Sequence, residues 1–247
     1  MEGTAKQEVI RQLQEKILKL EGFKPHTGIL NRIDFGLADI ESAFPFGTFP
    51  TAAVHEFISP TAVHATATNG FIASIVAKLM HAGNFCLWIS TKRSLSPIGL
   101  THFGIAPHQI IFIDITQDKD ALWVMEQALK CNALAAVVAE MEEVSFSESQ
   151  RLQLAVEKSN VTGFLHRRRP RHENTLACVS RWKIRSMASR VPDGLPGVGY
   201  PTWEVSLEKV RNGRPGKWQV SWQNNRLVHL SKETIPTTAR PNHEQYA

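Results

Sequence analysis

The chain has 247 residues, of which 43% are hydrophobic and 21% are charged, a composition typical of a globular protein with a single sizeable core. The N-terminus is polar and charged, and no apolar run approaches the roughly 20 residues that a membrane helix needs. These features argue against a secretory leader and a membrane span. We therefore expect a cytoplasmic protein with no membrane partner.

Cysteine and histidine spacing gives no sign of a metal site. Cys86, Cys131 and Cys178 lie in or beside apolar segments and show no C-x-x-C spacing. We interpret them as reduced thiols of the core. The ten histidines form no ligand pattern, so neither a metal nor another cofactor is expected.

The first fifty residues are predicted to precede the main domain. Residues 4–21 have apolar side chains at three- and four-residue spacing, which indicates an amphipathic helix. Residues 22–50 are rich in aromatic residues, proline and glycine, which is typical of a connector that wraps a core. We predict three parts: a helix and connector over 1–50, one domain over 51–230, and a disordered polar tail over 231–247.

From residue 53 the chain alternates short apolar runs with amphipathic segments, which predicts an α/β fold with a mainly parallel sheet covered by helices. The predicted strands are 53–58, 85–89, 110–114, 134–139 and 161–165, and the predicted helices are about 67–81, 97–103, 118–131 and 147–159.

The pattern changes after residue 175. Four strand-like runs, 175–189, 203–211, 218–223 and 226–230, are separated by segments rich in turn residues. Such spacing favours antiparallel hairpins that extend the sheet.

The segment from Ser59 to Phe71 follows an apolar strand and precedes a helix, the position of a phosphate-binding loop. The chemistry of such a loop is missing. After Ser59 and Pro60 no Gly-Lys-Ser/Thr can be placed, and the end of the segment reads Asn69-Gly70-Phe71. The sequence therefore predicts a nucleotide-binding scaffold whose phosphate loop is degenerate.

The positive charge is concentrated in one segment. Eight of the Lys and Arg residues lie between His166 and Arg190 against a single acid, Glu173, so this segment carries +7 while the rest of the chain carries −2. Closely spaced cations of this kind suit a phosphate backbone. The alternative is a solvated basic loop that only aids solubility.

Several stretches resemble known proteins. Val54 to Pro60 is similar to the strand that enters the phosphate loop of RecA. Ala121 to Val138 (ALWVMEQALKCNALAAVV), Arg151 to Glu157 (RLQLAVE) and the late segment 209–218 (KVRNGRPGKW) resemble the ImuA family, RecA-like accessory proteins of SOS-induced mutagenic repair. The resemblance covers about residues 30 to 230 and implies a RecA-like core.

The resemblance also shows where catalytic residues differ. Lys92 stands where RecA has its general-base glutamate, and a charged lysine cannot take a proton from water. Glu140 stands at the Walker-B aspartate. Together with the degenerate loop, these changes imply a protein that is not an enzyme.

By the same resemblance, the basic segment corresponds to a DNA-contacting loop of RecA-like proteins. The implied phosphate contacts are Arg167, Arg168, Arg169 and Arg171, with Lys183 farther along the segment. Lys209 and Arg211 lie on a Lys-x-Arg-Asn-Gly motif whose basic residues reach a neighbouring subunit in RecA-type motors. In this chain they would contact DNA or a partner, or would simply be exposed charges on an Asn-Gly hairpin.

The implied function is damage-induced translesion synthesis, with four partners: a Y-family-like polymerase homologue (ImuB), a replicative-type error-prone polymerase, RecA and single-stranded DNA. Two alternatives remain open. One is a cell-division inhibitor resembling SulA, which binds a cytoskeletal GTPase. The other is an ATPase with an unconventional loop, in which Lys78 or Lys92 replaces the missing lysine.

Overall fold

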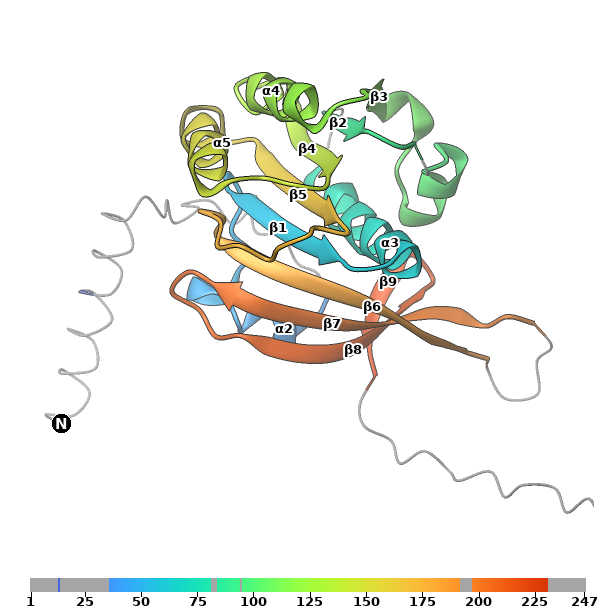
Figure 1. Ribbon diagram of the computed structural model, residues 1–247. Coiled ribbons are helices and arrows are strands. Elements are labelled where there is room, and N and C mark those ends of the chain that lie inside the picture. The colour runs from blue at the N-terminus through green and yellow to red at the C-terminus, as the bar shows by residue number, and fades with distance from the viewer. Residues whose placement is uncertain (1–12, 14–35, 81–83, 94, 192–196, 231–247) are drawn as a thin grey trace, which may run out of the picture.

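The computed structural model describes residues 13, 36–80, 84–93, 95–191 and 197–230 (Figure 1). Most of the predicted N-terminal helix and the whole predicted tail, 231–247, lie outside these residues. The domain boundaries proposed at 50 and 230 therefore remain predictions.

The described residues form one nine-stranded sheet with the order β3-β2-β4-β5-β1-β6-β7-β8-β9. All neighbours from β3 to β6 are parallel, and the pairs β6–β7, β7–β8 and β8–β9 are antiparallel. The strands are β1 (Val54–Ser59), β2 (Phe85–Ser90), β3 (Ile110–Asp114), β4 (Leu134–Met141), β5 (Thr162–Arg168), β6 (Ser180–Arg190), β7 (Tyr200–Val210), β8 (Gly216–Gln223) and β9 (Arg226–His229). The predicted α/β fold, with a parallel core and a C-terminal antiparallel extension, is confirmed.

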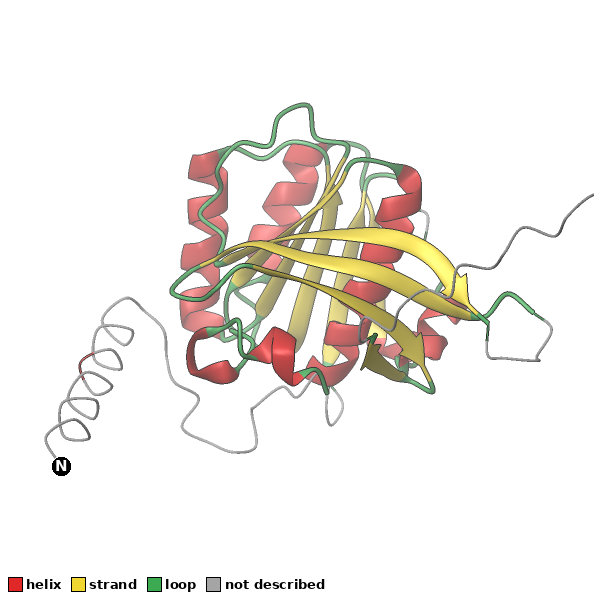
Figure 2. Ribbon diagram, turned by 90° about the horizontal axis from the view of Figure 1, so that it is seen from below, coloured by secondary structure: helices red, strands yellow, loops and turns green. Residues whose placement is uncertain are grey.

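Helices cover both faces of the parallel strands (Figures 1 and 2). One apolar cluster includes α3 (Ala62–Leu79) and continues along β6 to β9, and a second includes α4 (Asp118–Ala128) and α5 (Phe146–Ser159). Shorter helices are α2 (Ala38–Glu41) and the 3-10 turns η2 (Pro45–Gly47), η4 (Ile98–Phe103) and η5 (Pro107–Gln109).

The segment before β1 is part of the core. Leu37, Ile40, Phe44 and Phe49 are buried in the cluster on the α3 face. The Phe49 ring stacks on the His55 ring with centroids 4.2 Å apart. The described part of the predicted connector thus contributes apolar side chains to the same core as the sheet.

The predicted loop from Ser59 to Phe71 is wrong in its extent. Only Pro60 and Thr61 separate β1 from α3, and the Thr61 side chain caps the helix by accepting a hydrogen bond from the His64 backbone N–H. Between Ser59 and Gly70 the sequence has no glycine that would favour a loop.

Asn69, Gly70 and Phe71 therefore lie inside α3. Gly70 is explained by packing, because a Cβ at this position would lie 3.0 Å from the Trp203 ring. Phe71 is buried in the aromatic core beside Trp182 and Trp203. These residues thus belong to a helix that packs on the core, and their predicted place in a phosphate loop is wrong.

The connection from β5 to β6 runs alongside α5. The Ala177 backbone N–H donates to Ser149 Oγ at 2.9 Å, and the Asn174 side chain donates to the Val144 carbonyl at 2.9 Å. Leu176 is buried in the α4 and α5 cluster. The predicted strand 175–189 accordingly begins only at Ser180.

Two of the three cysteines follow the prediction. Cys86 and Cys178 are buried free thiols, and burial raises the pKa of both above its usual range. Cys131 is exposed, so its assignment to the core is wrong. Among the described residues, no helix combines the length and the hydropathy needed to cross a bilayer.

Candidate functional site at the carboxyl end of the sheet

The residues that end β5 point alternately to the two faces of the sheet, as in any strand. His166 and Arg168 point to the α3 face, where His166 contacts Ser59 of β1 and Arg168 contacts Glu140 of β4. Arg167 points to the opposite face, toward Glu56 and Glu143. The carboxyl end of the sheet therefore carries two separate polar groups, one on each face.

The group on the α3 face is centred on Glu140, which is fully buried at the end of β4. Its Oε1 accepts hydrogen bonds from Trp88 Nε1 at 2.9 Å and from Asn69 Nδ2 at 3.1 Å. Its Oε2 forms an ion pair with Arg168 Nη1 at 2.7 Å. Both oxygens of the carboxylate predicted at the Walker-B position are thus engaged by the chain itself.

Ser59 and His166 form a second buried contact on this face. Ser59 Oγ lies 2.8 Å from His166 Nε2 and 2.8 Å from Thr68 Oγ1. Burial, reinforced by the positive charge of Arg168, lowers the pKa of His166 to about 3. The imidazole is therefore neutral at physiological pH.

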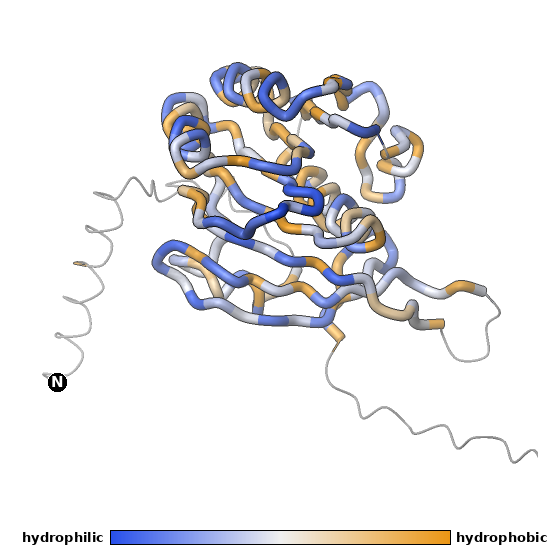
Figure 3. The backbone as a smooth tube through the Cα atoms, in the orientation of Figure 1, coloured by the Kyte–Doolittle hydropathy of each residue, from blue (hydrophilic) through white to orange (hydrophobic). Residues whose placement is uncertain are grey.

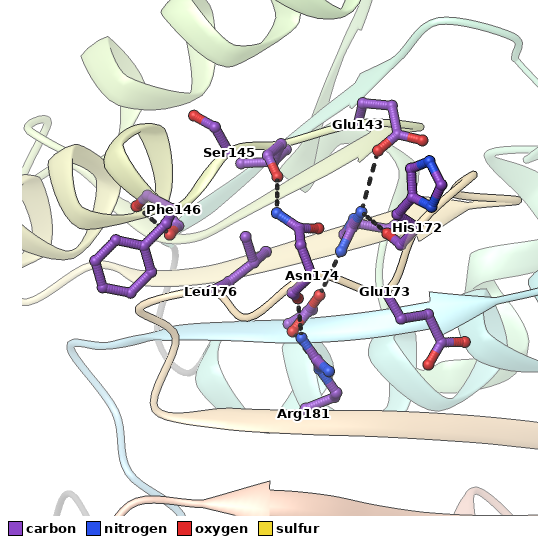
Figure 4. A network of polar contacts seen from close by, with 12 residues as sticks. Glu143, Ser145, Phe146, His172, Glu173, Asn174, Leu176 and Arg181 are labelled. Carbon is purple, nitrogen blue, oxygen red and sulfur yellow. Dashed lines mark hydrogen bonds and ion pairs between the residues drawn. The ribbon is translucent and has the colours of Figure 1, made fainter.

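The group on the opposite face is centred on Glu56, which is buried in the middle of β1. Its Oε1 pairs with Arg167 Nη1 at 3.0 Å, and its Oε2 pairs with Arg181 Nε at 2.7 Å. Arg181 also donates to the Asn174 carbonyl (Figure 4). One carboxylate therefore holds two arginines of the basic segment.

Arg167, one of the predicted DNA contacts, has a fully buried side chain. Besides Glu56 it contacts Glu143 Oε2 at 3.3 Å and the His172 carbonyl at 2.8 Å. Its position identifies a structural anchor for the turn that follows β5. Arg168, with 22% of its side chain exposed, is likewise engaged by Glu140 and by the Lys92 carbonyl at 3.2 Å.

Arg169 and Arg171 lie at the tip of the turn, on the surface. Arg169 adopts the left-handed conformation (φ 54°), and its backbone N–H donates to the Ser59 carbonyl at 2.8 Å. In the described part of the chain, neither guanidinium has a recorded ion pair. Figure 3 shows the hydrophilic run through this turn. The two exposed guanidinium groups are available to a ligand.

The other predicted DNA contacts are spread more widely. Lys183 pairs with Glu173 at 2.7 Å and with Glu208 at 3.1 Å. The exposed Lys209 donates to the Leu176 carbonyl at 3.1 Å, and the Arg211 backbone N–H donates to the Val179 carbonyl at 2.8 Å. Both lie near the end of β7, where the chain turns toward β8.

Lys92, predicted at the position of the catalytic glutamate, is exposed just beyond β2 and lies 3.8 Å from Glu142. Pro60 is exposed at the start of the short turn after β1. Within the described ranges, His, Cys, Asp and Glu side chains form no group of three that could hold a metal ion.

Two acids of the site, Glu56 and Glu143, were not singled out from the sequence. Glu56 interrupts an otherwise apolar strand, and a charge in such a strand signals a buried ionic partner. Glu143 gave no comparable signal, because an acid directly after a strand usually lies on a solvated surface.

No protein-family model matches the chain. The chain is 32% identical over 198 residues to Protein ImuA of Caulobacter vibrioides, strains NA1000/CB15N and ATCC 19089, covering 75% of this chain and 81% of that protein. It is 28% identical over 113 residues to the cell division inhibitor SulA of Photorhabdus laumondii, covering 46% of this chain and 64% of that protein.

Among solved structures, the crystal structure of the RadB recombinase is similar with a TM-score of 0.56 and 14% identity, covering 81% of this chain and 100% of that chain. At this identity the likeness shows the fold alone, which is RecA-like. The sequence likeness to Protein ImuA covers most of both chains. The chain therefore belongs to the ImuA family.

Proposed function

We propose that this chain is a non-catalytic, cytoplasmic accessory protein of SOS-induced mutagenic translesion synthesis. Membership of the ImuA family supports the pathway. The observation that carries the non-catalytic assignment is the state of Glu140, whose two oxygens are engaged by Trp88, Asn69 and Arg168. With three hydrogen bonds on its oxygens and the positive charge of Arg168 beside Oε2, this carboxylate is poorly suited to hold a metal-bound water.

The short connection between β1 and α3 supports the same conclusion. A phosphate-binding loop surrounds phosphate groups with several backbone N–H donors. Here Pro60 has no N–H, and the first turn of α3 is capped by Thr61. Lys92 is exposed and cannot act as a general base while charged.

The ATPase alternative is tested by titrating ATP and Mg²⁺ into the purified protein in a calorimeter. We expect no saturable heat. A saturable isotherm with one site per chain would contradict the non-catalytic assignment.

We further propose that Arg169 and Arg171 contact the phosphate backbone of single-stranded DNA, alone or within a RecA filament. Arginine forms bidentate hydrogen bonds with phosphate, and both side chains are exposed. Lys209 and Arg211 lie elsewhere on the surface and are proposed to serve DNA or a protein partner. Contact should be insensitive to base sequence.

The proposed protein partners are a Y-family-like polymerase homologue of the ImuB type and a replicative-type error-prone polymerase. Purification of the tagged chain from damaged cells should recover the polymerase homologue. The SulA likeness over 46% of the chain favours one alternative, inhibition of a division GTPase. Recovery of that GTPase in place of the polymerase homologue would favour the alternative.

A further inference from the structure

Glu143 is an acidic side chain beside the exposed arginine tip. It lies just beyond the end of β4, and 44% of its side chain is exposed. A carboxylate at this place would repel the phosphate groups that Arg169 and Arg171 are proposed to bind. The structure shows contacts that give it another role.

The two carboxylate oxygens of Glu143 contact two different parts of the turn. Oε1 accepts the backbone N–H of Arg171 at 2.6 Å. Oε2 accepts a hydrogen bond from Nη2 of Arg167 at 3.3 Å, and the same Nη2 donates to the His172 carbonyl at 2.8 Å. Glu143 thus joins the backbone of the tip to the buried arginine beneath it.

The anchor beneath the tip is fixed. Arg167 is fully buried and pairs with the buried Glu56 at 3.0 Å. The near side of the turn is held by the Arg169 N–H bonded to the Ser59 carbonyl, and the far side by the Asn174 side chain bonded to the Val144 carbonyl. Glu143 supplies the contact between these two ends.

We propose that Glu143 is a positioning residue that holds the Arg169–Arg171 tip in its DNA-binding conformation, an inference that rests on the DNA contact proposed above. A turn ordered before binding loses less conformational entropy when it meets its ligand. The gain from order outweighs the repulsion between one carboxylate and the phosphate backbone, because that repulsion acts through solvent.

Glu142 provides a matched control in the neighbouring position. Its side chain is 50% exposed and lies 3.8 Å from Lys92, and its backbone N–H donates to Asp118 Oδ2 at 2.8 Å. Removing either carboxylate changes the net charge by the same amount. Of these two acids, Glu143 alone bonds the tip in the described part of the chain.

The experiment compares Glu143→Ala and Glu142→Ala in full-length protein, with a labelled single-stranded oligonucleotide over a salt series. Charge alone predicts that both variants bind DNA more tightly. We expect Glu142→Ala to bind as well as the wild type or more tightly, and Glu143→Ala to bind about fivefold more weakly, the effect of losing one to two hydrogen bonds. Equal strengthening in both variants would overturn the inference.

Hydrogen exchange supplies a readout that does not depend on the variant's fold. In the wild type the Arg171 amide should exchange slowly, and an unprotected Arg171 amide would overturn the inference. In Glu143→Ala its exchange should accelerate while amides of β1 remain protected. A wild type that binds no DNA at any salt concentration would refute the DNA contact itself, whereas binding with equal strengthening in the two variants would refute only the role of Glu143.

Discussion

Arg167 and Arg168 are adjacent in sequence, yet they serve opposite faces of the sheet. Arg168 neutralises the buried Glu140 on the α3 face, and Arg167 neutralises the buried Glu56 on the other face. The guanidinium groups of Arg169 and Arg171, which follow in the turn after β5, form no ion pair among the described residues. The position of an arginine relative to the sheet, and not its clustering with others in the sequence, therefore decides whether it stabilises the fold or is exposed to a ligand.

The net charge of the segment 166–190 is therefore a poor measure of the charge it offers a ligand. Arg167, Arg168, Arg181 and Lys183 each pair with a carboxylate. Glu56, Glu140 and Glu143, three of those carboxylates, come from outside the segment. With Glu208, which pairs with Lys183, these acids reduce the local excess from +7 to +3 in three dimensions.

The largest expected effect is on stability, at Arg167. Arg167→Met should lower the free energy of unfolding by about 3–5 kcal/mol, because it weakens the compensation of the buried Glu56 charge. Urea unfolding measures this effect. Adding Glu56→Gln to Arg167→Met should recover part of the loss. A single variant as stable as the wild type would contradict the role of Arg167 as an anchor.

A smaller effect is expected on the α3 face. Arg168→Met should cost about 1–3 kcal/mol, because Glu140 keeps its hydrogen bonds from Trp88 and Asn69 and because Arg168 is partly exposed. The same urea experiment shows which of the two substitutions lowers the free energy of unfolding more. A larger loss for Arg168→Met than for Arg167→Met would reverse the comparison.

Lowering the pH should reduce the free energy of unfolding through two buried histidines on the α3 face, His55 and His166. Burial lowers the pKa of His55 to about 4 and that of His166 to about 3, below the ordinary value of 6.5. The unfolded chain thus binds protons more readily. The contribution of the two neutral histidines to the free energy of unfolding is fully present above pH 6.5. It is lost as the pH falls toward 4, and at pH 5 the loss is on the order of 1–2 kcal/mol per histidine.

The measurement is urea unfolding at pH 7 and pH 5 for the wild type and for His166→Gln. The variant should lose less stability between the two pH values than the wild type does. Equal losses would show that His166 does not contribute to the acid sensitivity.

The exposed arginines should affect stability least. Arg169→Ala and Arg171→Ala should each change the free energy of unfolding by no more than about 0.5 kcal/mol, as is usual for surface positions. Thermal unfolding checks this expectation. A loss comparable to that of Arg167→Met would mean that the tip belongs to the structural group.

The sequence predicts the fold well because the apolar residues of most elements occur at the spacing that their burial requires. All of β1 is buried, and β4 and β5 bury most of their length. The helix after β1 is the exception. A run rich in Ala and Thr, capped by Thr61, continues as helix through Gly70, and a Cβ at this glycine would lie 3.0 Å from the Trp203 ring.

The site is less predictable than the fold because its contacts join distant residues. Glu56 and Arg167 are separated by 111 positions, and Glu140 and Arg168 by 28. Charge counting along the chain cannot reveal such pairs. The alternation of side chains in β5 would separate Arg167 from Arg168, but only once the register with β1 and β4 is known.

The most direct test of the account is binding of a labelled single-stranded oligonucleotide over a salt series, with and without ATP, by the wild type, Arg169→Ala/Arg171→Ala and Arg185→Ala. We predict that binding is independent of ATP and that the slope of log K against log[salt] is smaller in magnitude by about two in the double variant. The single control Arg185→Ala, on β6, should change the affinity and this slope less. Unchanged affinity and slope in the double variant, or binding that requires ATP, would contradict it.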